Sequence, residues 1–441
     1  MKSFWTIVHR AYATASTRTA SNRILSSPVH GRTTPPIVSA NDAVSSIQSN
    51  SDIYIHSHAS TPTELLEALC QHVESKNLTD IRPSHIILQG NIPWLQEKFY
   101  GKIRSNCLFI DGMLRKLVNA VDVALISVSP PDERGFCTMG VDVDCSLAAA
   151  TSAKKIIAII NPSMPATFGA GLIHSSHIDY FVETDRPIYA KGKEEVSSEN
   201  ERKIGEIIAE NLVENGATLQ LGIGAIPDST LAAMKNHKNL GVHTELVSDG
   251  VLDLIELGVI NNSKKSIMPG KIVTSFAYGT EKFYKVLDRN PIFHFESCAW
   301  TNHVDIIRQN SRMTCINSCL EIDLTGQIVS DSIGSKFYSG FGGQVDFIFG
   351  SSVAVDKRGK AIIALTSRTN KGKSKIVPTL AQGAGVVTTR GHVNYVVTEY
   401  GVANLWGKNV RERARELINI AHPDDRENLE KEAYERFKCI V

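Results

Sequence analysis

Short runs of β-branched and aliphatic residues alternate with amphipathic stretches from Ile37 onward, and most of these runs are bounded by Pro or Gly. Runs of this kind are typical of buried parallel strands, and the stretches between them have helical periodicity. The pattern predicts an α/β protein in which helices cover a mainly parallel sheet. We expect strands at 51–56, 85–88, 121–129, 155–160, 217–221, 242–247, 292–295, 347–349, 361–365 and 393–397, and helices at 61–74, 198–215, 411–420 and 424–437.

The chain has 441 residues, which is more than a single hydrophobic core usually fills. The polar stretch 191–200 separates two series of alternating elements. The sequence therefore predicts one domain over residues 35–195 and a second over residues 196–441.

Charge and composition exclude several classes of function. The chain carries 47 Lys and Arg against 46 Asp and Glu, so no basic surface for nucleic acid is expected. It has no run of about eighteen apolar residues, and we expect no membrane-spanning segment. The eight cysteines include no Cys-x-x-Cys pair, so we expect neither a disulfide framework nor a structural metal. We expect the protein to reside in a reducing compartment.

The amino-terminal segment differs from the rest of the chain. Five Lys and Arg residues precede the first acidic residue, Asp42, and Ser, Thr and Ala are frequent between them. Phe4, Ile7 and Val8 recur at helical spacing beside Arg10. This composition predicts a mitochondrial transit peptide over residues 1–34 and a location in the matrix. A disordered tail is the alternative, and a secretory signal fits less well.

Two glycine-rich loops could bring backbone N–H groups close to a phosphate or an oxyanion. In 219–228 a strand runs into Gly222 and Gly224 before a helix, where anions are favoured. It is not a dinucleotide fingerprint, because Pro227 stands where the third glycine should be. The second loop, 339–347, precedes an expected strand. Tight turns remain the alternative for both loops.

The stretch 241–250 alternates, which would place His243, Glu245 and Val247 on one face of a strand. A carboxylate at the end of this strand, facing the glycine loops, could act as a nucleophile. A solvated carboxylate is the alternative.

Other motifs receive a structural interpretation. Glu214-Asn215-Gly216 resembles a known nucleophile triplet, but Gly216 is well placed to cap a helix. His56 and His58 alternate and could bind a metal, yet no third ligand is suggested. We therefore predict no metal.

Several segments together resemble the acetyl-CoA hydrolase/transferase family of class I CoA-transferases. They are 128–135, 222–228, 243–250, 316–318, 340–347 and 397–403. The resemblance implies two similar α/β domains with the active site in the cleft between them. Apart from the resemblance, we expect a homo-oligomer.

The resemblance also implies roles for individual residues. Glu245 corresponds to the covalent nucleophile, and Asn302 to an asparagine kept near it. The residues that correspond to CoA contacts are Gly222, Ile223, Gly224, Ala225, Ile226, Asn317, Gly340, Gly342 and Gly343.

The implied reaction moves CoA from an acyl-CoA such as acetyl-CoA to a short carboxylic acid such as succinate or acetate. It passes through a glutamyl-CoA thioester with ping-pong kinetics. CoA is then a substrate, and no cofactor is permanently bound. Because a free glutamate has a pKa of about 4.3, Glu245 is expected to be ionised without a general base.

Two departures from the family's pattern affect this interpretation. The chain has His56-Ser57-His58 where members usually have His-Gly near the first strand. It also passes directly from Ala120 to Val121, where members carry an extra stretch. Two alternatives therefore remain: an acetyl-CoA hydrolase using the same site, and an inactive splice form or paralogue that only binds CoA.

Overall fold

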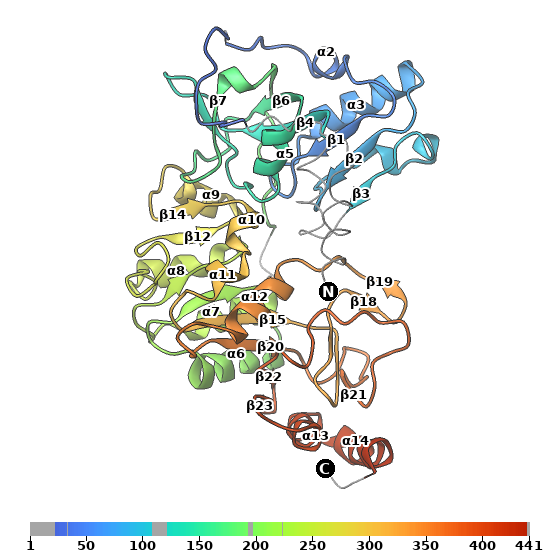
Figure 1. Cartoon of the computed structure of the whole chain (residues 1–441), viewed down its shortest axis with the longest axis vertical. Coiled ribbons are helices and arrows are strands. Elements are labelled where there is room, and N and C mark those ends of the chain that lie inside the picture. The colour runs from blue at the N-terminus through green and yellow to red at the C-terminus, as the bar shows by residue number, and fades with distance from the viewer. Residues whose placement is uncertain (1–22, 33, 108–120, 193–196, 223, 439–441) are drawn as a thin grey trace, which may run out of the picture.

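The computed structural model describes residues 23–32, 34–107, 121–192, 197–222 and 224–438 (Figure 1). Most of the expected transit peptide, Ile223 and the residues immediately before Val121 lie outside the described residues. Within the described ranges, no helix is long and apolar enough to cross a membrane.

The first half of the chain forms a parallel six-stranded sheet with the order β3-β2-β1-β4-β6-β8. From β1 the chain moves outward to β2 and β3, and then returns to the other side of β1 as β4. Ligand sites in such sheets lie at the carboxyl ends of the strands where this direction reverses. The strands are β1 (Asp52–Ile55), β2 (Arg82–His85), β3 (Asn106–Cys107), β4 (Val123–Val128), β6 (Lys155–Ile160) and β8 (Tyr180–Glu183).

The second half forms another six-stranded sheet with the order β10-β9-β15-β20-β22-β23. Its pairs are parallel except for the terminal hairpin of β22 and β23. The direction of chain progress reverses at β9, because β10 lies on one side of it and β15 on the other. The strands are β9 (Thr218–Leu221), β10 (Gly241–Val242), β15 (Met313–Ser318), β20 (Lys360–Ala364), β22 (Tyr395–Thr398) and β23 (Gly401–Asn404).

Smaller strand pairs and helices complete the fold. The remaining strands are β5 (Phe136–Thr138), β7 (Leu172–His174), β11 (Leu246–Val247), β12 (Ile272–Thr274), β13 (Phe276–Ala277), β14 (Phe293–Phe295), β16 (Glu321–Asp323), β17 (Ile328–Val329), β18 (Ser332–Ile333), β19 (Lys336–Phe337) and β21 (Ile376–Val377). The α-helices are α2 (Ala40–Val44), α3 (Thr63–Ser75), α5 (Ser146–Ser152), α6 (Glu199–Leu212), α7 (Ala225–Ala233), α8 (Leu252–Glu256), α9 (Glu281–Leu287), α10 (Cys298–Thr301), α11 (Val304–Ile307), α12 (Gln344–Ser352), α13 (Val410–Asn419) and α14 (Pro423–Phe437).

Helix α6 shows how local sequence determines an element. Ser198 caps its amino terminus and Glu201 returns the hydrogen bond, so the two residues form a capping box. Ile204, Ile208 and Leu212 recur every fourth residue and are buried, which gives the helix one apolar face against the sheet.

Each sheet has one hydrophobic layer of its own and contributes to a layer shared by both halves. On β1, Ile53 and Ile55 belong to the core of the first half, while Tyr54 points into the shared core. Leu219 of β9 and Ile316 of β15 belong to the same shared core. The two halves are therefore packed together by buried apolar side chains.

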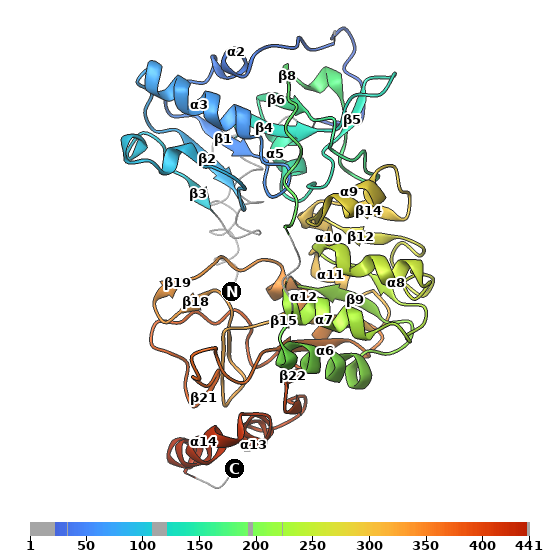
Figure 2. The same cartoon turned by 180° about the vertical axis from the view of Figure 1, so that it is seen from behind.

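Backbone hydrogen bonds also join the two halves, in a contact that we call the seam (141–144 with 275–277 and 298). Val143 N–H donates to Ser275 O at 3.0 Å, and Ala277 N–H donates to Val141 O at 2.8 Å. Asp142 and Phe276 form an antiparallel bridge. Figure 2 shows the elements β12, β14 and α9 lying between the two large sheets.

The predicted α/β class with mainly parallel sheets is confirmed. Three predicted strands are wrong in part or entirely. Residues 347–349 belong to helix α12, because a short apolar run does not distinguish a strand from a buried helical turn. The run 242–247 is divided into β10 and β11, and the run 85–88 overlaps β2 only at His85. The domain boundary at 195/196 stays a prediction.

Candidate active site

Glu245 lies in a break between two short strands. Strand β10 ends at Val242 and β11 begins at Leu246, so simple alternation does not determine where its side chain points. The backbone oxygen of Glu245 instead accepts three hydrogen bonds, from Ser275 N–H at 2.9 Å, Phe276 N–H at 3.0 Å and Thr274 Oγ1 at 3.0 Å. Since Ser275 and Phe276 belong to the seam, contact between the two halves fixes the backbone of Glu245.

The carboxylate of Glu245 meets two of the residues expected near it. Asn302 Nδ2 donates a hydrogen bond to Glu245 Oε2. Gly343 lies against the same group: a Cβ atom there would overlap Glu245 Oε2 and come within 2.6 Å of Asn302 Nδ2. The structure thus brings Glu245, Asn302 and Gly343 together. Asn302 follows α10, and Gly343 precedes α12.

The environment of Glu245 favours its protonated form more than the sequence predicts. Burial raises the pKa of Glu245 to about 7, while the hydrogen bond from Asn302 opposes this rise. The carboxylate of Asp346 also raises the pKa. The expectation that Glu245 is ionised without a general base stays a prediction. The residue as a whole is half-buried, whereas its carboxyl group is largely removed from solvent.

His243 supports the same segment but does not carry charge. Burial and the nearby Lys265 lower the pKa of His243 to about 3. The neutral ring donates from Nε2 to Thr301 O at 2.8 Å. Thr301 O accepts a hydrogen bond from His243, and the adjacent Asn302 donates one to Glu245. These two bonds connect the end of α10 to the segment around Glu245.

The first glycine loop lies where the second sheet reverses direction. Gly222 N–H donates to Ile316 O at 3.0 Å, and the side chains of Gln220 and Asn317 bond each other at 2.8 and 3.2 Å. Thr244 Oγ1 donates to Leu221 O at 3.3 Å, which links this loop to the residue before Glu245. The predicted CoA contacts Gly222 and Asn317 are therefore neighbours at the carboxyl edge.

The other predicted CoA contacts have different surroundings. Gly224 has a φ of +124° and precedes α7, in which Ala225 and Ile226 form the first turn. Gly340 and Gly342 are exposed in the loop before α12, whereas Gly343 is buried at Glu245. Ile223 lies outside the described residues. No contact in the structure shows these residues binding CoA, so their roles stay predictions.

Glu214 and Glu399 are alternative candidates for the nucleophile, and both bond to structural partners. Glu214 forms ion pairs with Arg358 and with Lys360, the latter at 3.1 Å. The expected helix cap at Gly216 is wrong, because α6 ends at Leu212, although Gly216 does have a positive φ of 77°. Glu399 accepts hydrogen bonds from Ser367 N–H and Oγ at 2.9 and 2.6 Å.

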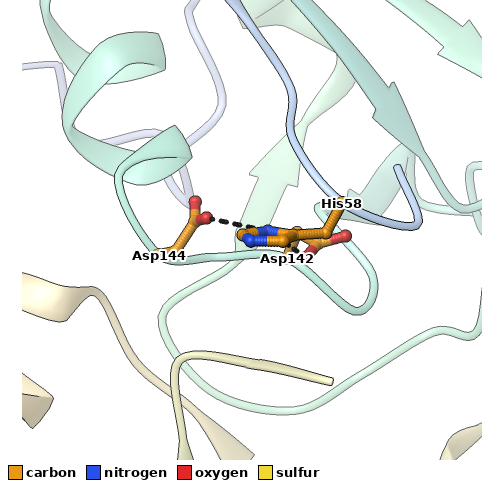
Figure 3. Close-up of side chains that lie close together, drawn as sticks. All are labelled: His58, Asp142 and Asp144. Carbon is orange, nitrogen blue, oxygen red and sulfur yellow. Dashed lines mark ion pairs between the residues drawn. The ribbon is translucent and has the colours of Figure 1, made fainter. Parts of the chain in front are cut away.

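A buried cluster on the first sheet was missed by sequence reasoning. His58 Nδ1 lies 3.3 Å from Asp142 Oδ1 and 3.7 Å from Asp144 Oδ2 (Figure 3). These side chains are 84 and 86 positions apart in sequence, so only the alternation of Asp142 and Asp144 could have pointed to them. His56 is separate, because its ring is bonded to Ser127 N–H and Asp142 O.

Within this cluster, the two carboxylates together outweigh burial in their effect on the pKa of His58. Burial would lower the pKa of His58, but Asp142 and Asp144 raise it above its ordinary value. Burial raises the pKa of Asp144. The ring of His58 stacks on Phe276, with the ring centroids 4.1 Å apart. The cluster therefore lies against β13, where the backbone N–H of Phe276 donates to Glu245 O.

Comparison with known proteins identifies the family. Residues 107–190 match the acetyl-CoA hydrolase/transferase N-terminal domain, and residues 279–433 match the acetyl-CoA hydrolase/transferase C-terminal domain. Among solved structures, 4-hydroxybutyrate CoA-transferase from Porphyromonas gingivalis has a TM-score of 0.81 at 37% identity, covering 91% of this chain and 98% of its own. RipA from Yersinia pestis has a TM-score of 0.84 at 32% identity, with the same coverage.

Curated relatives agree with these structures. The chain is 46% identical to a succinyl-CoA:acetate/propanoyl-CoA:succinate CoA transferase of Fasciola hepatica, over 94% of this chain and 91% of the relative. It is 45% identical to a 4-hydroxybutyrate CoA transferase of Clostridium kluyveri, over 91% and 98%. Acetyl-CoA hydrolases of yeasts also match, at 28–30% identity. The chain therefore belongs to the acetyl-CoA hydrolase/transferase family, and it is a CoA-transferase.

Proposed function

We propose that this CoA-transferase moves CoA from an acyl-CoA to a short carboxylic acid, with Glu245 as the covalent nucleophile. The observation that carries the proposal is the meeting of Glu245, Asn302 and Gly343 at one carboxylate. Gly343 leaves no side chain between the carboxylate and an incoming carbonyl, and Asn302 fixes the orientation of Glu245.

The reaction is a sequence of acyl exchanges at one carboxylate. An oxygen of ionised Glu245 attacks the acyl carbonyl carbon, the carbon–sulfur bond breaks, and CoA leaves as a thiolate. The thiolate then attacks the glutamyl carbonyl of the resulting anhydride, which releases the first acid as a carboxylate. A second carboxylate attacks the glutamyl-CoA thioester, and the same steps run in reverse to release the new acyl-CoA.

The surroundings of Glu245 suit this chemistry. A carboxylate that has lost most of its water is a stronger nucleophile than a solvated one, and its raised pKa reflects the same loss of solvation. Each tetrahedral intermediate carries an oxyanion, and one well-placed N–H donor is worth about 3–4 kcal/mol. The backbone of the glycine loops around Gly222 and Gly343 could supply such donors.

The named relatives indicate the class of acceptor. Their names include succinate, acetate and 4-hydroxybutyrate, which are short chains with a carboxylate, and propanoyl-CoA, the thioester of another short acid. We propose that this chain accepts acids of the same class, as a homo-oligomer in the mitochondrial matrix. CoA serves as a substrate in this scheme rather than as a bound cofactor.

A covalent adduct on Glu245 is the first expected result. Incubating the protein with acetyl-CoA and then borohydride should reduce a glutamyl thioester to an alcohol, which peptide mass mapping should place on Glu245. Glu245→Ala should abolish CoA transfer to succinate while CoA binding persists.

Matched variants of the rival carboxylates serve as controls. Glu214→Gln and Glu399→Gln should keep the adduct on Glu245, although they remove structural hydrogen bonds. A reduced residue at position 214 or 399 in the wild-type protein would contradict the assignment. Acetyl-CoA consumption that does not depend on an acceptor acid would indicate a hydrolase, and CoA binding without turnover would indicate an inactive form.

Gly343→Ala should slow catalysis without unfolding the protein. The φ of Gly343 is −70°, so alanine fits the backbone, but its Cβ would displace the Glu245 carboxylate. Misplacement by about 1 Å can cost on the order of a hundredfold in rate. We expect kcat for CoA transfer to fall by about this factor while the melting temperature changes little.

Gly391→Ala is the matched control for this substitution. Gly391 is exposed, and a Cβ there would meet only Thr389 Oγ1 at 3.6 Å. This variant should behave as wild type. If Gly343→Ala kept the wild-type kcat, the close contact with Glu245 would have no catalytic meaning.

The pH dependence of transfer should report the pKa of Glu245. Because only the ionised form attacks, kcat/KM should rise with pH through a midpoint near 7 and level off above it. Asn302 stabilises the charged form, so Asn302→Ala should raise the midpoint by about one to two pH units.

The shift between variants is the informative quantity in this experiment. Burial lowers the pKa of Lys265 to about 7, so a midpoint near 7 alone does not identify Glu245. Asn310→Ala removes another buried asparagine and should leave the midpoint unchanged. An unshifted midpoint in Asn302→Ala would assign the titration to a group other than Glu245.

Localisation can be tested with fluorescent fusions. The first 41 residues contain no Asp or Glu, and we expect residues 1–34 to direct a fused fluorescent protein to mitochondria. A fusion of the chain that lacks residues 1–30 should stay in the cytosol. Mitochondrial import of this truncated form would contradict the proposed transit peptide.

A further inference from the structure

Three buried polar side chains converge on one point of the first half of the chain. His58, Asp142 and Asp144, which we call the His58 cluster, are almost completely inaccessible: 7% of the His58 side chain is exposed and none of either carboxylate. Their ligand-type atoms lie within 4.8 Å of one another. Figure 3 shows the imidazole edge directed at both carboxylates.

Each carboxylate is held so that one oxygen is satisfied and the other is not. Asp142 Oδ2 accepts from Ser60 N–H at 3.1 Å and Ser60 Oγ at 2.5 Å. Asp144 Oδ1 accepts from Ser146 N–H at 2.9 Å and Ser146 Oγ at 2.8 Å. The remaining oxygens, Asp142 Oδ1 and Asp144 Oδ2, have no hydrogen-bond partner among the described residues, and neither does His58 Nδ1.

The imidazole is held as firmly as the carboxylates. His58 has a φ of 49°, a left-handed conformation that costs a residue with a side chain about 1 kcal/mol or more. Its backbone N–H donates to Ile87 O at 2.7 Å, and its imidazole ring stacks on Phe276. Outer hydrogen bonds such as those on the two carboxylates, which orient a group and leave its inner atom free, are typical of metal-ligand shells.

The two buried carboxylates favour a cation beside them. When both are ionised they carry two negative charges, and burying an uncompensated charge costs several kcal/mol. One proton on His58 balances one of these charges, whereas a divalent cation bound by neutral His58 balances both.

The donor set indicates the kind of cation. The 3.3 and 3.7 Å separations of His58 Nδ1 from the two carboxylate oxygens are short enough for all three groups to reach one ion. One nitrogen and two carboxylate oxygens are ligands that suit zinc.

We propose that His58 Nδ1, Asp142 Oδ1 and Asp144 Oδ2 bind one zinc ion, with a water molecule as the fourth ligand. The site lies at the carboxyl end of β1, where the first sheet reverses direction. The ion would connect the loop after β1 to the loop before α5, and both loops support the seam. The proposal does not depend on the reaction catalysed at Glu245.

Metal content of the purified full chain, without a metal-binding tag, tests the proposal. After zinc addition and gel filtration, elemental analysis should find one zinc per chain. Asp144→Asn and His58→Ala should lose it. Dialysis of the wild type against a chelator should lower the melting temperature by several degrees, because a ligand bound only by the folded state stabilises that state. Cobalt in place of zinc should give the intense visible bands of a tetrahedral site.

Two further variants separate metal loss from misfolding. His58→Cys supplies a thiolate in place of the imidazole and should retain zinc, although it loses the ring stack as His58→Ala does. Asp323→Asn changes a buried aspartate in the second half and should keep the metal. Zinc content far below one per chain in the wild type, or zinc retained by His58→Ala, would overturn the proposal. A metal-free wild type with an unchanged melting temperature would show that protons alone hold the cluster.

Discussion

The backbone oxygen of Glu245 is the point on which the arrangement of the site depends. It accepts hydrogen bonds from Thr274, Ser275 and Phe276, and the last two residues also belong to the seam with 141–144. The strand that holds the nucleophile is therefore itself held by the other half of the molecule. A change in how the halves meet would move the Glu245 carboxylate, and displacements of about 1 Å matter for acyl transfer. The shared hydrophobic core resists such a change.

Burial has opposite consequences for the two ionisable residues of this segment. It raises the pKa of Glu245 and lowers that of His243, because low polarity disfavours the charged form of each. A neutral His243 is useful as a fixed hydrogen-bond donor to Thr301. A desolvated Glu245 is useful as a nucleophile, provided that a donor such as Asn302 keeps enough of it ionised. The site therefore balances reactivity against ionisation chiefly through the amide of Asn302, with a smaller contribution from His58.

The sequence predicted the fold class because the apolar runs of a parallel sheet are local signals. It predicted the grouping of Glu245, Asn302 and Gly343 only through resemblance, since these residues come from three separate elements. Residues 347–349 were misassigned because three apolar residues fit a strand or a helix equally well. The raised pKa of Glu245 and the approach of His58 to Asp142 arise from tertiary packing, which no local pattern encodes.

The conformation of His58 links these observations. A residue with a side chain stays in the left-handed region only when its surroundings compensate for the strain. Here the compensation is the stack on Phe276 and the attraction of two carboxylates. The backbone N–H of the same Phe276 donates to Glu245 O, so His58 and the nucleophile contact one shared residue. The departure of His56-Ser57-His58 from the usual His-Gly pattern is thus coupled, through one aromatic residue, to the geometry of the active site.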